Sequence, residues 1–122
     1  MGGVAPLPPE PLAQWGTHDT ATFRRGESMP ELLSAQAIEQ ELSELPGWTR
    51  EGDTLTRTWE VKGFNAAMQL ANVVAYVANR ANHHPDILVH DYKWVTVTTT
   101  THDSGGITGN DTALARTIEA TL

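Results

Sequence analysis

The chain has 122 residues, the length of a single domain, and its 39% hydrophobic content is too high for a chain that is disordered throughout. Eight basic and fifteen acidic side chains give a net charge of −7, which argues against nucleic acid or an anionic membrane surface as the main partner. No apolar run approaches the ~20 residues of a membrane-spanning helix. The absence of Cys excludes disulfides, thiolate metal sites and a Cys nucleophile. No secretory signal is visible, so we expect a cytoplasmic protein.

Residues 1–29 are rich in Pro and Gly and show no sustained helical or strand period. This composition is typical of a segment that has too little apolar surface to fold on its own. We therefore predict a mobile extension over residues 1–29 and one domain over residues 30–122.

The domain begins with a predicted helix and a predicted hairpin. Ser34 is a suitable N-cap, Pro46-Gly47 ends the helix, and apolar residues recur between them at Ile38, Leu42 and Leu45. Residues 48–51, the turn pair Gly52-Asp53 and the alternating residues 54–61 predict a hairpin whose apolar side faces a core.

A long helix is predicted next. No residue in the range 63–79 is charged, and apolar residues recur at helical spacing, among them Ala67, Ala71 and Val74. This pattern predicts a long, mostly buried helix whose alanines allow close packing on a sheet.

A second hairpin and a last helix complete the chain. Residues 87–89 and 93–100 are predicted strands, because apolar residues alternate with threonines in the second of them, and a turn is expected at His90-Asp91. Thr108 and Asp111 form a T-x-x-D capping box before a helix with apolar residues at Leu114, Ile118 and Leu122.

The predicted order of elements is α-β-β-α-β-β-α. Hairpins are antiparallel by construction, so this order excludes a doubly wound parallel sheet. We expect an α+β fold, with a four-stranded antiparallel sheet and helices packed on one face.

Histidines cluster in the second half of the chain. His83 and His84 stand where the long helix must end before Pro85, and His102 follows the last predicted strand. The start of one strand and the end of its antiparallel neighbour meet at the same edge of a sheet, so we expect these three imidazoles to converge. Imidazole titrates near neutrality and serves as an acid or a base, so the cluster indicates proton transfer. For His90, in a turn, a solvated side chain is the simpler expectation.

Other interpretations of these residues stay open. Histidines at a helix C-terminus also interact with its last carbonyls and its dipole. Three imidazoles could hold zinc, although adjacent histidines seldom aim at one ion and no H-x-x-x-H spacing is present. Asp111 needs no role beyond its capping box. Trp94, expected near the cluster, could stack on a flat ligand.

The run N-H-H-P-D at residues 82–86, the run T-H-D-S-G-G-I-T at residues 101–108 and Asp111 resemble the pterin-4a-carbinolamine dehydratase family, over residues 32–122. Members dehydrate 4a-hydroxytetrahydropterin to quinonoid dihydropterin, which regenerates the cofactor used in aromatic amino acid hydroxylation. The resemblance implies a hydro-lyase with a pterin substrate, no metal and no cofactor, which forms a homo-oligomer, either a dimer or a tetramer.

The resemblance also implies the site residues, position by position. His83, His84 and His102 match the catalytic histidines, and the substrate-binding matches are Pro85, Thr101, Asp103, Ser104 and Asp111. We assign the acid and base roles to His83 and His102, in an order left open, and positioning of the pterin to His84. Relatives on this fold also serve as chaperones or coactivators, so the alternative function is a non-catalytic assembly or dimerisation module.

Two positions depart from the family's pattern. Asn79 stands where many members carry a glutamate four residues before the first histidine, and Asn110 stands where they carry a basic residue before the aspartate. Helical spacing places Asn79 one turn before His83, on the same helix face.

Overall fold

The computed structural model describes residues 29–122, and residues 1–28, which hold nearly all of the predicted extension, lie outside the described part. The elements are, in order, α2 (Ala35–Leu42), β1 (Thr49–Glu51), β2 (Thr54–Glu60), α3 (Phe64–Ala81), β3 (Asp86–His90), β4 (Trp94–Thr99), the short 3₁₀ helix η1 (His102–Ser104) and α4 (Gly109–Thr121). The predicted α+β architecture and the predicted order of helices and strands are confirmed. Among the helices of residues 29–122, none combines the length and the hydropathy of a membrane span.

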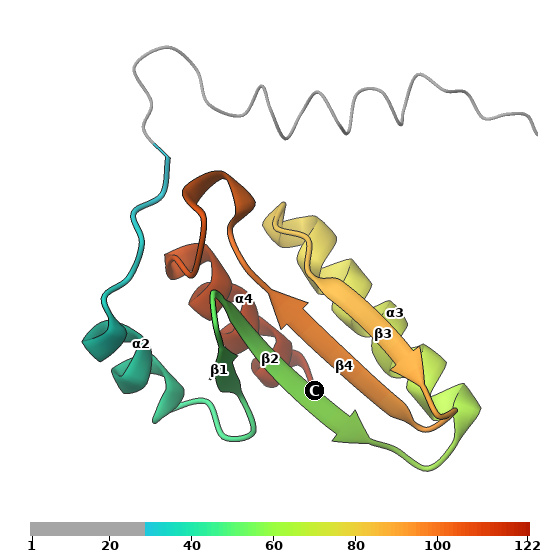
Figure 1. The fold of residues 1–122 in the computed structure, drawn as a ribbon. Helices are drawn as coiled ribbons and strands as arrows, with labels where there is room; N and C mark the ends of the chain where they lie inside the picture. The colour runs from blue at the N-terminus through green and yellow to red at the C-terminus, as the bar shows by residue number, and fades with distance from the viewer. Residues whose placement is uncertain (1–28) are drawn as a thin grey trace, which may run out of the picture.

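The strands form one antiparallel sheet in the order β1-β2-β4-β3 (Figure 1). The turn between β1 and β2 uses Gly52 at φ +60°, a left-handed conformation that glycine adopts without strain. In the second hairpin Asp86 pairs with Thr98, and His90 pairs with Trp94. The residues just before β3 and just after β4 therefore lie at one end of the sheet, and the β3–β4 turn lies at the other.

One face of the sheet carries the hydrophobic core. Helices α3 and α4 lie across that face (Figure 1), and the inward alternation of β4 runs through Val95, Val97 and Thr99, all fully buried. Ala67 and Ala78 of α3 are also buried, and their small side chains let the helix approach the sheet closely. The sheet thus fixes α3 and α4, and with them the residues at their ends.

Helix α3 is less buried than predicted. Its sheet-facing residues are buried, whereas Phe64, Met68 and Tyr76 are exposed. A helix on one face of a sheet buries only part of its circumference, and these three residues lie outside the buried part. Leu122, the last predicted apolar position of α4, is exposed as well, because the helix ends at Thr121.

Candidate active site

His83 lies at the junction between α3 and β3. Helix α3 ends at Ala81, Asn82 adopts the left-handed conformation at φ 54°, and Pro85 prevents any continuation. The backbone N–H of His83 donates to the carbonyl of Ala78 at 3.1 Å, which closes the end of the helix. The junction therefore fixes the backbone of His83.

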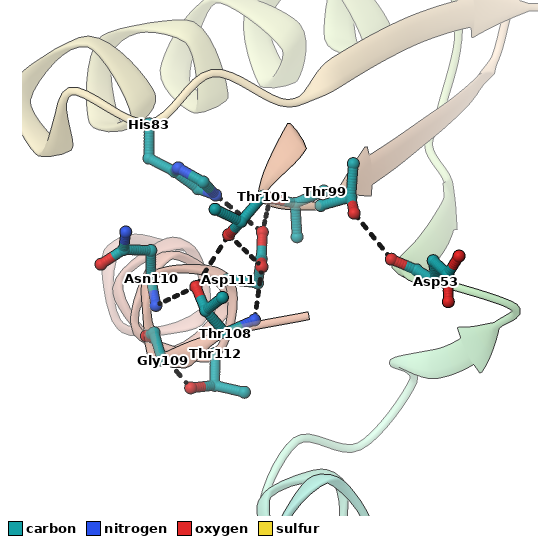
Figure 2. Close-up of polar contacts among 10 residues, drawn as sticks. Asp53, His83, Thr99, Thr101, Thr108, Gly109, Asn110, Asp111 and Thr112 are labelled. Atoms are coloured by element: carbon teal, nitrogen blue, oxygen red, sulfur yellow. Dashed lines mark hydrogen bonds and ion pairs between the residues drawn. The ribbon is translucent and has the colours of Figure 1, made fainter. Parts of the chain in front are cut away.

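The ring of His83 contacts a buried carboxylate. Its Nε2 lies 2.7 Å from Oδ1 of Asp111, and the two side chains are 14% and 0% exposed. Asp111 belongs to the first turn of α4, so the contact joins the end of one helix to the start of another (Figure 2). A buried charge is tolerated only where hydrogen bonds compensate for the lost water, so the surroundings of Asp111 decide its state.

Three further donors reach Asp111. Its Oδ1 also accepts from the hydroxyl of Thr99 at 2.6 Å. Its Oδ2 accepts from the hydroxyl of Thr101 at 2.7 Å and from the backbone N–H of Thr108 at 2.9 Å. Each carboxylate oxygen thus accepts two hydrogen bonds, which fills the lone-pair directions that a carboxylate offers. Figure 2 shows these side chains gathered around Asp111.

The bond from Thr108 is half of the predicted capping box, which is confirmed. The hydroxyl of Thr108 completes the N-cap by accepting from the backbone N–H of Asn110 at 3.1 Å. One carboxylate therefore both closes the N-terminus of α4 and contacts His83.

Asp111 is ionised at neutral pH in these surroundings. Burial alone raises the pKa of Asp111, but the hydrogen bonds that it accepts, led by the bond from His83, outweigh burial and hold the pKa below its ordinary value of 3.8. An ionised carboxylate only accepts hydrogen bonds, so Nε2 of His83 carries the hydrogen. In the neutral ring Nδ1 is then the nitrogen with the free lone pair.

His84 lies outside this pair and is exposed. Its Nε2 is 3.2 Å from the amide oxygen of Asn79. The expectation that Asn79 shares a helix face with His83 is wrong, because the helical spacing does not continue past Ala81. The left-handed residue Asn82 turns the chain, so that His84, and not His83, lies beside Asn79.

The third candidate histidine lies on the loop after β4. His102 begins η1, and both His102 and Asp103 are exposed. The loop and the C-terminal end of α3 lie at the same end of the sheet (Figure 1), as the antiparallel register requires. The hydroxyl of Ser104 donates to the backbone carbonyl of Pro30 at 2.6 Å, so the segment before α2 supports this loop.

Trp94 and His90 lie at the opposite end of the sheet. The prediction that Trp94 lies near the histidine cluster is wrong, because His83 precedes β3 whereas Trp94 follows the turn at the far end of that strand. His90 is partly exposed, and its ring nitrogens lie 2.9 Å from Asp91 Oδ2 and 2.9 Å from Thr96 Oγ1.

A metal centre finds no support in the described part of the chain. Within residues 29–122, no group of three His, Cys, Asp or Glu side chains could hold a metal ion.

Comparison with known proteins places this chain in a family. Residues 31–121 match the family described as Pterin 4 alpha carbinolamine dehydratase. This chain belongs to that family.

Individual relatives match over similar lengths of the chain. The "Putative pterin-4-alpha-carbinolamine dehydratase" of Nocardia farcinica is 50% identical over 91 residues, which span 73% of this chain and 93% of that protein. A relative of the same name from Thermomicrobium roseum is 49% identical over 84 residues, or 69% of this chain and 89% of the relative. The crystal structure of a transcriptional coactivator/pterin dehydratase from Brucella melitensis matches with a TM-score of 0.68 at 29% identity, and covers 74% of this chain and 97% of that one.

Thr99 is the one donor to Asp111 that the sequence prediction for this dehydratase-family chain left out. It continues the inward alternation of Val95 and Val97, so a hydroxyl falls at a position that the pattern predicts to be buried. Buried hydroxyls are nearly always hydrogen-bonded, so this alternation was the available signal for a polar partner under the sheet.

The Asp111→Asn variant tests the charge of the buried carboxylate. We expect it to lower the free energy of unfolding by roughly 2–4 kcal/mol at neutral pH, because an amide cannot accept hydrogen bonds at both of its positions. The folded-state pKa of Asp111 is depressed, so its stabilisation is present above the ordinary value of 3.8 and is lost as the pH falls through the folded-state pKa. Urea unfolding in a pH series should therefore show a difference that shrinks in acid.

Asp103→Asn is the matched control, because Asp103 is exposed on the neighbouring loop. Its effect should stay within about 0.5 kcal/mol. Equal losses in the two variants, or a loss in Asp111→Asn that does not depend on pH, would contradict the role of the buried charge.

Proposed function

We propose that this protein is a hydro-lyase that dehydrates 4a-hydroxytetrahydropterin (pterin-4a-carbinolamine) to quinonoid dihydropterin, in the regeneration of tetrahydropterin. The observation that carries the proposal is the pair formed by His83 and the buried carboxylate of Asp111. A histidine held in one tautomer by a fixed acceptor is suited to proton transfer, and the family match supplies the substrate class.

In the proposed reaction the C4a–O bond breaks, the hydroxyl leaves as water after it is protonated, and the ring N–H loses its proton. One proton is delivered and one is removed, so the reaction consumes no net proton. Neutral His83 can accept the ring proton at Nδ1, because its Nε2–H is donated to Asp111. We assign the acid role to His102, which is exposed on the loop at the same end of the sheet.

The other predicted site residues fall into two groups, one exposed or partly buried and one buried, for which we propose different roles. His84 and Asp103 are exposed and Pro85 is partly buried, and we propose that these three contact the pterin. Asp111 and Thr101 are 0% and 6% exposed, and their polar atoms are hydrogen-bonded internally, so we propose that they act through His83. Ser104 supports the loop through Pro30.

The alternative is a non-catalytic assembly module. The Brucella melitensis protein is described as a transcriptional coactivator as well as a pterin dehydratase, so one related fold is associated with both descriptions. An assembly module would not need a buried ionised partner for His83, and for this reason we favour the enzyme.

Replacing either proposed proton carrier tests the enzyme. We expect purified protein to accelerate carbinolamine dehydration, and His83→Ala and His102→Ala each to lower the rate by roughly 10²–10⁴-fold, as is typical when an acid or base group is lost. His90→Ala, at the opposite end of the sheet, is the matched control and should keep the wild-type rate. Activity should persist in a chelator.

Near-wild-type turnover in both His83→Ala and His102→Ala would exclude the proposed roles. Absence of any acceleration by the wild-type protein would instead favour the assembly module.

We further propose that the protein forms a homo-oligomer, a dimer or a tetramer, through the outer face of α3. Phe64, Met68 and Tyr76 are exposed on this helix, residues 63–79 carry no charge, and the guanidinium of Arg80 lies over the Tyr76 ring at the C-terminal end. An exposed helix surface with several large apolar side chains and little charge is typical of a contact surface. A second copy of the chain presents the same surface, so the two surfaces are chemically matched.

A charge on this surface tests the oligomer. We expect Met68→Lys to lower the molar mass measured by light scattering toward that of one chain, because a desolvated ammonium has no partner on an uncharged face. Ala113→Lys adds the same charge at an exposed position of α4 and should leave the mass unchanged. A wild-type mass equal to one chain would refute the proposal.

A further inference from the structure

The donors that surround Asp111 carry an inference that rests on the proposed dehydratase function. We propose that Thr99 and Thr101 are positioning residues, which hold the Asp111 carboxylate in the one orientation that keeps Nε2–H of His83 engaged and its Nδ1 free. Neither threonine needs to touch the pterin in this role. Their hydroxyls act through Asp111 on His83.

Thr99 and His83 both donate to the same oxygen, Oδ1 of Asp111. The hydroxyl of Thr99 donates to this oxygen at 2.6 Å, and His83 Nε2 lies 2.7 Å from it. Thr99 is fully buried in β4, so its hydroxyl is held more rigidly than the hydroxyl of an exposed side chain would be. Because the two donors share one acceptor, the direction from which Thr99 approaches restricts where the His83 ring can lie.

Thr101 donates to Oδ2 of Asp111 and belongs to a chain of hydroxyls in which the direction of every hydrogen bond is determined. The ionised carboxylate cannot donate, so Thr101 gives its hydrogen to Oδ2 at 2.7 Å. The 2.7 Å contact between the hydroxyls of Thr101 and Thr108 must then take its hydrogen from Thr108. The hydroxyl of Thr108 in turn accepts from the backbone N–H of Asn110.

Every hydrogen in this chain therefore points toward Asp111, starting from the N-terminus of α4. Donor groups at a helix N-terminus favour negative charge, so the helix and the hydroxyls act in the same direction. Within residues 29–122, no buried side-chain nitrogen or oxygen lacks a hydrogen-bond partner, so the removal of one donor leaves an acceptor of this network without that bond.

The groups that face Asp111 are otherwise neutral. His83 from the α3–β3 junction is the titratable contact, while β4 contributes the hydroxyl of Thr99, the following loop that of Thr101, and α4 the N–H of Thr108. The ionisation of Asp111 thus depends on hydrogen bonds and on His83 rather than on a second fixed charge, so deleting one hydroxyl should change it measurably.

The decisive variants are Thr99→Val, which keeps the shape and removes the hydroxyl, and Thr99→Ser, which keeps the hydroxyl. We expect Thr99→Val to lower kcat by about 10-fold or more with little change in KM, because a hydrogen bond to a charged acceptor is lost, and Thr99→Ser to restore most of the rate. Thr98→Val is the matched control. The hydroxyl of Thr98 lies on the opposite face of β4, 3.1 Å from that of Thr56, so kcat should be unchanged.

A double-mutant cycle separates action through Asp111 from any other role. In the Asp111→Asn background, Thr99→Val should cost little further activity, because the acceptor on which it acts has already been altered. An undiminished further loss would show that Thr99 acts without Asp111, and would overturn the inference.

A titration of the Asp111 carboxyl carbon by ¹³C NMR tests the same inference without activity. We expect Thr99→Val to move the midpoint upward by about one pH unit, and Thr99→Ser and Thr98→Val to leave it near the wild-type value. An unchanged midpoint in Thr99→Val would overturn the inference. If Thr99→Val does not fold, Thr101→Val, which removes the donor to the other oxygen, is measured instead with the same expectation.

Failure of the proposed function gives a different result. In that case the wild-type protein does not accelerate dehydration, while the carboxyl titration still reports whether the two threonines control Asp111.

Discussion

A buried carboxylate that must remain charged constrains the whole site. Asp111 is fully buried, and its charge is tolerated because donors from four separate parts of the chain converge on it. The α3–β3 junction supplies His83, strand β4 supplies Thr99, the loop after β4 supplies Thr101, and the start of α4 supplies the N–H of Thr108. The packing of α3 and α4 on the sheet therefore also assembles the candidate site, because it brings these donors to Asp111.

The fold meets this requirement through the register of the second hairpin. The pairing of Asp86 with Thr98 brings the residues before β3 next to those after β4, so His83 faces the segment that carries Thr101. Asp111 then serves a structural purpose, as the capping-box residue of α4, and a chemical one, as the acceptor that selects the tautomer of His83. The two purposes agree because both need an ionised carboxylate in one fixed place.

Local signals in the sequence were sufficient for the fold and for part of the site. The turn pair Gly52-Asp53, the capping box at Thr108 and the end of the helix before Pro85 each act over a few residues, and each is present in the structure. The partner of His83 depends on tertiary packing, which spacing along the chain does not encode. Thr99 was overlooked because a threonine in a strand is ordinarily explained by strand propensity alone. The predicted position of His83 relative to Asn79 is wrong because the left-handed residue Asn82 ends the helical spacing before His83.

The tautomer of the His83 ring tests the central claim most directly. Ring ¹⁵N chemical shifts, measured on the wild-type protein at a pH where the ring is neutral, distinguish a protonated nitrogen from one with a free lone pair. The account predicts that Nε2 is protonated and that Nδ1 has the free lone pair, because Nε2–H is donated to Asp111. A hydrogen on Nδ1, with Nε2 unprotonated, would contradict it, since the carboxylate would then have no hydrogen to accept from His83.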